Sequence, residues 1–202
     1  MALWPLHRVN PVKRVVAATY QSVSGTGQAA VRELTEQTQR VLENHRAAPH
    51  VYPHQIAFNL LPEIGSFKDD GYTSEEWKMA AESRKIMHHP DLAFSATCVR
   101  VPVYVGHSIA VHVELSRAME PEDAQSILRE APGVVVHDDP TISLYPQPWT
   151  AAGRDEVFVG RIRQDSSHPR GLAFWVVCDN LRKGAALNAL QIAEQLVCRG
   201  LI

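Results

Sequence analysis

The chain has 202 residues, of which 45% are hydrophobic and 21% are charged, and its formal net charge at pH 7 is −2. These values are ordinary for a folded protein with one sizeable core, so we expect a single domain over residues 1–202. They exclude the basic footprint of a nucleic-acid-binding protein or of one that binds anionic membranes. No apolar run approaches the roughly 20 residues of a membrane span.

The three cysteines, Cys98, Cys178 and Cys198, are widely spaced and form no CxxC pair. This usage indicates a reducing, cytoplasmic location and argues against a disulfide framework or a zinc ribbon. Cys98 lies within an apolar segment, where a thiol usually packs as a small hydrophobic group. We therefore do not expect Cys98 to be a nucleophile.

The first half of the chain predicts a helix at 1–6, a strand at 13–19, a glycine-containing turn at 20–27, a helix at 28–46 and a helix from about 74 to 89. The segment 1–6 consists of apolar residues and has no polar helix-capping residue before it, so it is typical of the middle of a buried helix. Thr73 and Glu76 have the spacing of a capping box. Pro90 cannot continue the helix that they begin.

The second half predicts strands at 95–105 and 109–115, a helix at 122–130, a strand at 134–136, strands at 158–163 and 172–178, and a final helix after Asp179-Asn180. Pro121 suits the first turn of a helix. Pro169 and Gly171 suit a hairpin between the last two strands. The sequence therefore predicts an α+β fold, in which helices cover a mixed, largely antiparallel sheet.

Glu75 and Lys78 are three residues apart and share one face of a predicted helix. One interpretation is a solvated ion pair, and the spacing alone favours it. The other is a functional pair, in which the carboxylate binds an ammonium group and the lysine binds a phosphate.

Arg100 and His107 lie at the two sides of an apolar segment that contains Pro102 and Gly106. A buried arginine is costly unless it meets an anionic group, and its planar fork suits a carboxylate. A regular strand would place the two residues on opposite faces, but Pro102 and Gly106 predict an edge and a bend that turn His107 back. A structural role, as a buried ion pair and a hydrogen-bonded histidine, and a role in a binding site remain equally open.

The ten histidines do not form a metal-binding pattern. His50 and His54 have helical spacing, but a proline lies between them, and the adjacent His88 and His89 lack the spacing of a zinc site. We therefore expect no metal. The segment 24–27 is neither a GxGxxG motif nor a phosphate-binding loop.

An ordered series of segments resembles aspartate-semialdehyde dehydrogenases. The matching segments are TYQSVSGTG at 19–27, IAFNLL at 56–61, YTSEEWKM at 72–79, SATCVRVPVYVGH at 95–107, FVGRIR at 158–163 and DNLRKGA at 179–185. They occur in the order of the family and cover most of the chain. The resemblance implies the catalytic and dimerisation domain, whose fold is that of the C-terminal domain of glyceraldehyde-3-phosphate dehydrogenase.

The resemblance also implies an activity, the NADPH-dependent reductive dephosphorylation of aspartyl 4-phosphate to aspartate 4-semialdehyde. This reaction belongs to the biosynthesis of lysine, threonine, methionine and diaminopimelate. His107 would be the general acid/base, an imidazole titrating near neutral pH, and Gln21 would orient the substrate or its acyl intermediate. Arg100 would hold the substrate carboxylate, Glu75 its ammonium group and Lys78 the leaving phosphate.

For the cofactor, the resemblance implies that Ser24 and Gly25 approach NADP through backbone groups and that Asn180 contacts its nicotinamide end. In the family, the main cofactor domain and an Asn-Cys-Ser-Thr motif with the nucleophilic cysteine precede the segment that matches Met1-Ala2-Leu3. We therefore expect this chain alone to be inactive, and its final helix, which packs on the cofactor domain in the family, to be loosely held or repacked.

Two other functions remain open. One is a noncatalytic dimerisation module, since this half supplies the subunit interface in the family. The other is a relative that acts on N-acetylglutamyl phosphate, although the joint presence of Glu75, Lys78 and Arg100 favours the aspartyl substrate. The resemblance also implies a two-fold homodimer formed through the sheet, with the same patch on both subunits.

Overall fold

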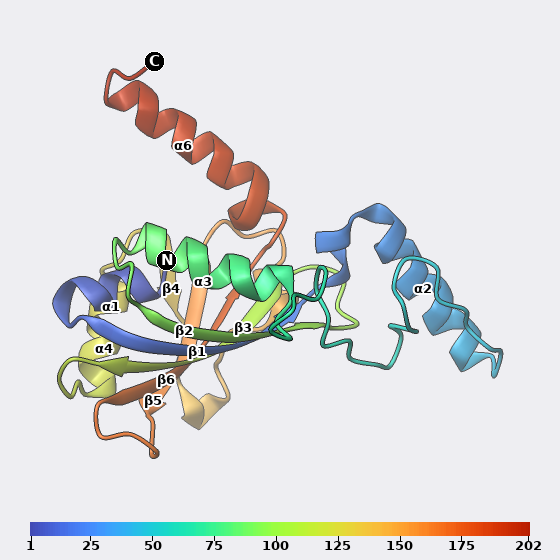
Figure 1. The fold of residues 1–202 in the computed structure, drawn as a ribbon, viewed down its shortest axis with the longest axis horizontal. Helices are drawn as coiled ribbons and strands as arrows, with labels where there is room; N and C mark the ends of the chain where they lie inside the picture. Colours follow the sequence, from blue (N-terminus) through green and yellow to red (C-terminus); the bar gives the residue numbers. More distant parts are fainter.

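The computed structural model describes residues 1–202, which form one six-stranded sheet with packed helices and two helices that project from it (Figure 1). The strands are β1 (Val12–Gln21), β2 (Ala93–Arg100), β3 (His107–Leu115), β4 (Val134–Val136), β5 (Val157–Gln164) and β6 (Gly171–Cys178). The α-helices are α1 (Leu3–Val9), α2 (Gln28–Leu42), α3 (Ser74–Ile86), α4 (Pro121–Arg129), α5 (Pro148–Ala151) and α6 (Leu187–Cys198). Short turns of other helix types are η1 (Val23–Thr26), η2 (Pro140–Ile142) and η3 (Arg182–Ala186).

The strand order in the sheet is β2-β1-β3-β6-β5-β4. The pairs β1–β2 and β4–β5 are parallel, and the pairs β1–β3, β3–β6 and β5–β6 are antiparallel. The expected mixed, largely antiparallel sheet is therefore confirmed. None of the helices is both long and apolar enough to cross a membrane.

The main core lies on one face of the sheet. Along β1, Val15 and Ala17 are buried, whereas Val16 and Ala18 are only half-buried, as expected where successive side chains point to opposite faces. Leu6 of α1 and Leu128 of α4 are fully buried in the same core as Val15. The face that carries Val16 and Ala18 is thus less covered than the face that packs against the helices.

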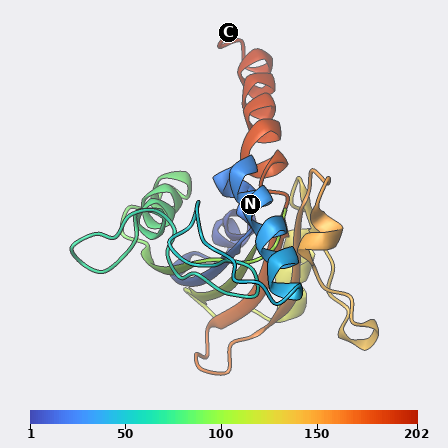
Figure 2. The same cartoon turned by 90° about the vertical axis from the view of Figure 1, so that its right-hand side faces the viewer.

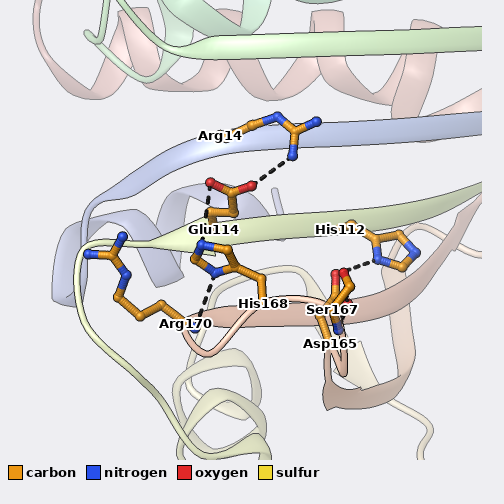
Figure 3. Close-up of polar contacts among 7 residues, drawn as sticks. All are labelled: Arg14, His112, Glu114, Asp165, Ser167, His168 and Arg170. Carbon is orange, nitrogen blue, oxygen red and sulfur yellow. Dashed lines mark hydrogen bonds and ion pairs between the residues drawn. The ribbon is translucent and has the colours of Figure 1, made fainter.

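A group of charged and polar side chains occupies one end of this second face (Figure 3). Arg14 of β1 pairs with Glu114 of β3 at 2.7 Å, and His112 of β3 lies 2.9 Å from Asp165 in the β5–β6 hairpin. We call this group the polar cluster, and its members are Arg14, His112, Glu114, Asp165, Ser167, His168 and Arg170.

The expected helix start at Thr73 is confirmed. The hydroxyl of Thr73 accepts the Glu76 N–H, and the Glu76 carboxylate accepts the Thr73 N–H, so both halves of the capping box are present. The helix ends at Ile86, earlier than expected, because His88 adopts a left-handed conformation with φ of 50°. Helix α2 likewise ends at Leu42, since Asn44 is left-handed with φ of 59°.

The strand expected at 95–105 is also shorter than predicted, since β2 ends at Arg100. Pro102 has no N–H to continue the ladder, which accounts for the irregular segment that follows. The β5–β6 hairpin is confirmed as an antiparallel pair.

The final helix, α6, extends away from the sheet, and the chain ends at its far tip (Figures 1 and 2). None of its residues is buried. Large apolar side chains such as Leu190, Ile192 and Val197 are exposed along it. The expectation that this helix is loosely held stays a prediction.

Candidate active site

Four strand ends meet at one edge of the sheet and bring together residues that are far apart in the sequence. Strands β1 and β2 are parallel, and Gln21 pairs with Arg100 at their shared end. Because β3 is antiparallel to β1, its first residue, His107, lies at the same edge. Strand β6 ends opposite His107, at Cys178, and delivers Asn180 two residues later.

Ser22, the residue after β1, connects the groups at this edge. Its backbone N–H donates to Nδ1 of His107 at 3.1 Å, and its hydroxyl oxygen lies 3.0 Å from the same nitrogen. Its carbonyl oxygen accepts a hydrogen bond from Nη1 of Arg100 at 2.7 Å. Ser22 is fully buried, so these contacts have little competition from water.

Asn180 holds the turn after β1 against the loop before β3. Its Oδ1 accepts the Gly106 N–H at 2.9 Å and the Ser22 hydroxyl at 3.0 Å, and its Nδ2 donates to Oγ of Ser24 at 3.0 Å. Gly106 has φ of 96°, and an added Cβ would come within 3.0 Å of Pro148. The bend expected at Gly106 is therefore confirmed, and it turns His107 toward Ser22.

Arg100 is buried, with 6% of its surface exposed, and no carboxylate forms an ion pair with it. Its Nε has no hydrogen-bond partner. Burial lowers the pKa of Arg100, and the ring of Tyr52 lies 6.0 Å from its guanidinium carbon. The interpretation of Arg100 as half of a buried ion pair is therefore wrong.

His107 is hydrogen-bonded, as one of its two interpretations required, but its expected titration near neutral pH is wrong. Burial, and then the positive charge of Arg100, lower the pKa of His107 to about 4, while Asp179 acts in the opposite direction. Both causes disfavour the charged ring. His107 is therefore neutral at physiological pH.

Gly25 faces both of these groups. A Cβ at this position would lie 3.1 Å from Nη1 of Arg100 and 3.3 Å from Nε2 of His107. A side chain at position 25 would therefore crowd both groups. This steric requirement for glycine was not evident from the sequence alone.

Glu75 and Lys78 lie in the first turns of α3, outside this hydrogen-bonded group. Their charged atoms are 3.7 Å apart, and their side chains are 28% and 57% exposed, respectively, so the pair has the form of a surface ion pair. Glu75 is near enough for its charge to raise the pKa of Arg100 against the effect of burial. Lys78 makes no hydrogen bond with the group around His107 and lines an open depression of about 660 Å³ with Lys68 and Trp77.

The buried carboxylate of Glu76 anchors this end of α3 beside the site. Besides closing the capping box, it accepts the N–H of Cys98 in β2 at 2.8 Å. The capping box was predicted, but its link to β2 could not be, because nothing in the spacing of Glu76 and Cys98 indicates it.

Neither Cys98 nor Cys178 is prepared as a nucleophile. Burial raises the pKa of Cys98 to about 11, which agrees with the expectation for this residue. Cys178 is the cross-strand neighbour of His107, but burial and the charge of Asp179 raise its pKa. Cys198 is exposed on α6.

Sequence reasoning missed three residues of the site, Ser22, Tyr52 and Asp179. Asp179 is buried and accepts N–H groups from Gly153 and Leu181, a local pattern that an aspartate before a turn could have indicated. Ser22 and Tyr52 had no sequence signal, since their roles depend on contacts with distant segments.

Comparisons with known proteins identify the family of the chain. The family model described as "Semialdehyde dehydrogenase, dimerisation domain" matches residues 3–183. Aspartate-semialdehyde dehydrogenases from Aquifex aeolicus and Bacillus subtilis are 52% and 49% identical over 100% and 96% of the chain. The chain spans only about 60% of the length of these relatives.

Solved structures give the same result. A Vibrio cholerae aspartate semialdehyde dehydrogenase II, described as complexed with ASA, superposes with a TM-score of 0.93 at 44% identity, over 97% of this chain and 58% of that one. A Candida albicans enzyme described as containing NADP gives 0.73 at 25% identity, over 100% and 55%. The chain therefore belongs to the semialdehyde dehydrogenase dimerisation-domain family, and its relatives are aspartate-semialdehyde dehydrogenases.

Proposed function

We propose that this chain is the catalytic and dimerisation part of an aspartate-semialdehyde dehydrogenase, which reduces aspartyl 4-phosphate with NADPH to aspartate 4-semialdehyde. The observation that carries the proposal is the buried guanidinium of Arg100, which has no carboxylate partner and lies beside the neutral ring of His107. A buried cation of this kind is stabilised when an anionic ligand pairs with it. The relatives are named for an enzyme that acts on an aldehyde carrying a carboxylate.

Each site residue has a role in this proposal. Arg100 binds the substrate carboxylate through two parallel hydrogen bonds, and Gln21, its neighbour in the β1–β2 ladder, orients the acyl group. His107 acts at the reacting carbonyl group. Glu75 binds the substrate ammonium group, and Lys78, one turn further along α3, binds the phosphate that leaves.

The relative that acts on N-acetylglutamyl phosphate is the alternative substrate assignment. An acetylated amine carries no charge and needs no carboxylate partner, whereas Glu75 supplies one near Arg100. We therefore favour the aspartyl substrate. A Glu75→Gln variant that impairs use of aspartate semialdehyde but not of N-acetylglutamate semialdehyde would support this choice.

Three residues fit one end of NADP. Gly25 leaves space beside Arg100 and His107 that a side chain would fill, and Ser24 precedes it in the same turn. Nδ2 of Asn180 has one N–H beyond the one that it donates to Ser24. When bound, the cofactor supplies the hydride, and in our proposal these residues position its nicotinamide end.

The reaction also needs a thiolate that forms a thioester with the substrate. The thiols at positions 98 and 178 have raised pKa values, so neither is prepared for this role. In our proposal the thiolate comes from a part of the relatives that the chain does not cover, and the 202 residues alone are inactive. The free thiols are also consistent with a cytoplasmic location, which we propose for the protein.

The activity can be tested by joining the chain to the uncovered part of the Aquifex aeolicus relative. We expect NADP-linked oxidation of aspartate semialdehyde in the presence of phosphate from the joined protein, and none from the chain alone. Arg100→Lys should raise KM strongly, because lysine cannot bind a carboxylate through two parallel bonds. Arg14→Lys, far from the site, serves as the control. A joined, folded protein without turnover would contradict the proposal.

We also propose that the chain forms a two-fold homodimer through the less covered face of the sheet. Half-buried Ala18 and Ala110 are cross-strand neighbours near the middle of this face, and Trp175 follows Ala110 in the next strand. Ala18→Arg should convert a dimer to a monomer in light scattering without altering the fold. A dimer that persists in Ala18→Arg would contradict this interface. A dimer that forms from an inactive joined protein would instead favour the noncatalytic module.

A further inference from the structure

The N–H of Ser22 and the Nδ1 of His107 form a hydrogen bond whose direction is fixed. A backbone N–H can only donate, so Nδ1 must be the acceptor in the observed 3.1 Å contact. A neutral imidazole carries one proton, and when Nδ1 accepts, that proton is on Nε2. The contact therefore selects one of the two neutral forms of the ring.

The hydroxyl of Ser22 does not change this choice. It lies 3.0 Å from Nδ1 of His107 and 3.0 Å from Oδ1 of Asn180. If Nδ1 carried a proton, the hydroxyl oxygen could accept a hydrogen bond from it and the hydroxyl could still donate to Asn180. The hydroxyl therefore has a hydrogen-bond partner with either form of the ring. Only the buried N–H would lose its partner, which favours the Nε2–H form by roughly five- to 150-fold.

The other end of the ring lies beside Gly25. Nε2 of His107 and Nη1 of Arg100 both point toward Gly25, where an added Cβ would touch each of them. Two donors therefore lie side by side: a permanently charged guanidinium and a neutral N–H. The positive charge of Arg100 and the burial of the ring disfavour a second proton on the ring, which agrees with the lowered pKa of His107 and keeps the ring neutral.

We propose that Ser22 is a positioning residue, whose backbone N–H keeps His107 in the Nε2–H form and so makes it a neutral hydrogen-bond donor to the oxygen of the reacting carbonyl group. In this role no proton leaves the ring. The N–H stabilises the negative charge that develops on that oxygen, as a preorganised donor does in an oxyanion hole. The identity of the acceptor oxygen rests on the proposed function, whereas the form of the ring does not.

Nuclear magnetic resonance of the ¹⁵N-labelled 202-residue chain tests the form of the ring directly. Long-range ¹⁵N–¹H correlations at neutral pH should show Nε2 protonated and Nδ1 unprotonated. An experiment that detects coupling across hydrogen bonds should connect the Ser22 amide nitrogen to Nδ1 of His107. A ring protonated on Nδ1, or equal amounts of the two forms, would overturn the proposal.

Two substitutions separate the N–H from the hydroxyl. Ser22→Ala retains the N–H and should keep the Nε2–H form. Replacing the Ser22 amide with an ester, through the corresponding α-hydroxy acid, removes only the N–H and should lower the preference by at least fivefold. The same ester at Ser24, whose N–H donates to the Tyr104 carbonyl, is the matched control and should leave the ring unchanged. A Ser22 ester that leaves the ring unchanged would contradict the role of Ser22.

The outcome is independent of the activity test. If the joined protein shows no turnover while the ring is in the Nε2–H form, the proposed function fails and the assignment of the ring stands. If the joined protein is active while Nδ1 carries the proton, the proposed function stands and the role of Ser22 is wrong.

Discussion

Two histidines of strand β3, His107 and His112, lie five residues apart in opposite environments. His107 is surrounded by buried groups, and the cation of Arg100 contributes to its low pKa. His112 is exposed and lies 2.9 Å from the carboxylate of Asp165, and this contact contributes to the lowered pKa of Asp165 (Figure 3). The same side chain is thus kept neutral at one end of the strand and faces an anion at the other. The neighbours from other strands, rather than the strand itself, determine this difference.

The largest effect should come from the titration of His107. Its pKa falls from 6.5 to about 4 on folding, so the unfolded chain binds more protons between these values, and stability is lost as pH falls from 6.5 to 4. The loss should be about 3 kcal/mol. Urea unfolding at several pH values would measure it.

His107→Asn is the matched variant, because its side-chain oxygen can accept the Ser22 N–H without titrating. It should remove most of this dependence on pH. If the variant and the original chain lose stability equally over this range, the environment assigned to His107 is wrong.

Asn180→Ala should have the next largest effect, because it removes the acceptor of the Gly106 N–H and of the Ser22 hydroxyl. We expect a loss of about 2 kcal/mol in the free energy of unfolding, from a buried N–H left unpaired. Asn188→Ala on the exposed α6 is the control and should change stability by less than about 0.5 kcal/mol. Equal losses of stability in the two variants would show that the Asn180 contacts do not stabilise the fold.

Asp165→Asn should have a smaller effect at the other end of β3. Asp165 accepts hydrogen bonds from Ser167 and His112, in that order of importance, and both lower its pKa. The contribution of the Asp165 carboxylate to stability is present above pH 3.8 and is lost as pH falls through its folded pKa. The free energy of unfolding of the variant at pH 7 should therefore be lower by about 1 kcal/mol or less. The difference in stability between the variant and the original chain should disappear in strong acid, below the pH range in which His107 titrates. A difference that disappears between pH 6.5 and 4 would contradict this separation.

Arg14→Ala should have the smallest effect. Arg14 and Glu114 form a 2.7 Å pair, but the arginine side chain is 52% exposed. Exposed pairs contribute from about 0.2 to 1 kcal/mol. Chemical unfolding in low and high salt should show a small difference in stability that decreases with salt. A loss above about 2 kcal/mol would mean that the pair is more protected from water than the 52% exposure of Arg14 indicates.

Local patterns predicted most of the elements but not all of their ends. The strand at 13–19 and the capping box at Thr73 depend on neighbouring residues, and both were predicted correctly. The ends of α2 and α3 depend on the left-handed residues Asn44 and His88, which no spacing rule indicated. A pattern of residue types predicts the course of an element better than its last turn.

The site shows a similar division. The bend at Gly106 was predicted because glycine and proline have strong local preferences, and the structure contains it. The lack of an ion pair at Arg100 and the low pKa of His107 were not predicted, because each depends on which distant groups lie beside them. The roles that the family resemblance implied for Glu75, Lys78 and the other site residues stay predictions.

The hydrogen bonds of Ser22 also have a consequence for the order of folding. Ser22 bonds to His107 across 85 positions and to Asn180 across 158 positions of the chain. Closing such long loops is entropically unfavourable, and proteins dominated by distant contacts fold slowly. These contacts can form only after β1, β3 and β6 have assembled, so no fragment folded earlier contains the site. Protection of the Ser22 amide from solvent exchange should therefore be among the last to appear during refolding, and it marks the completion of the native sheet.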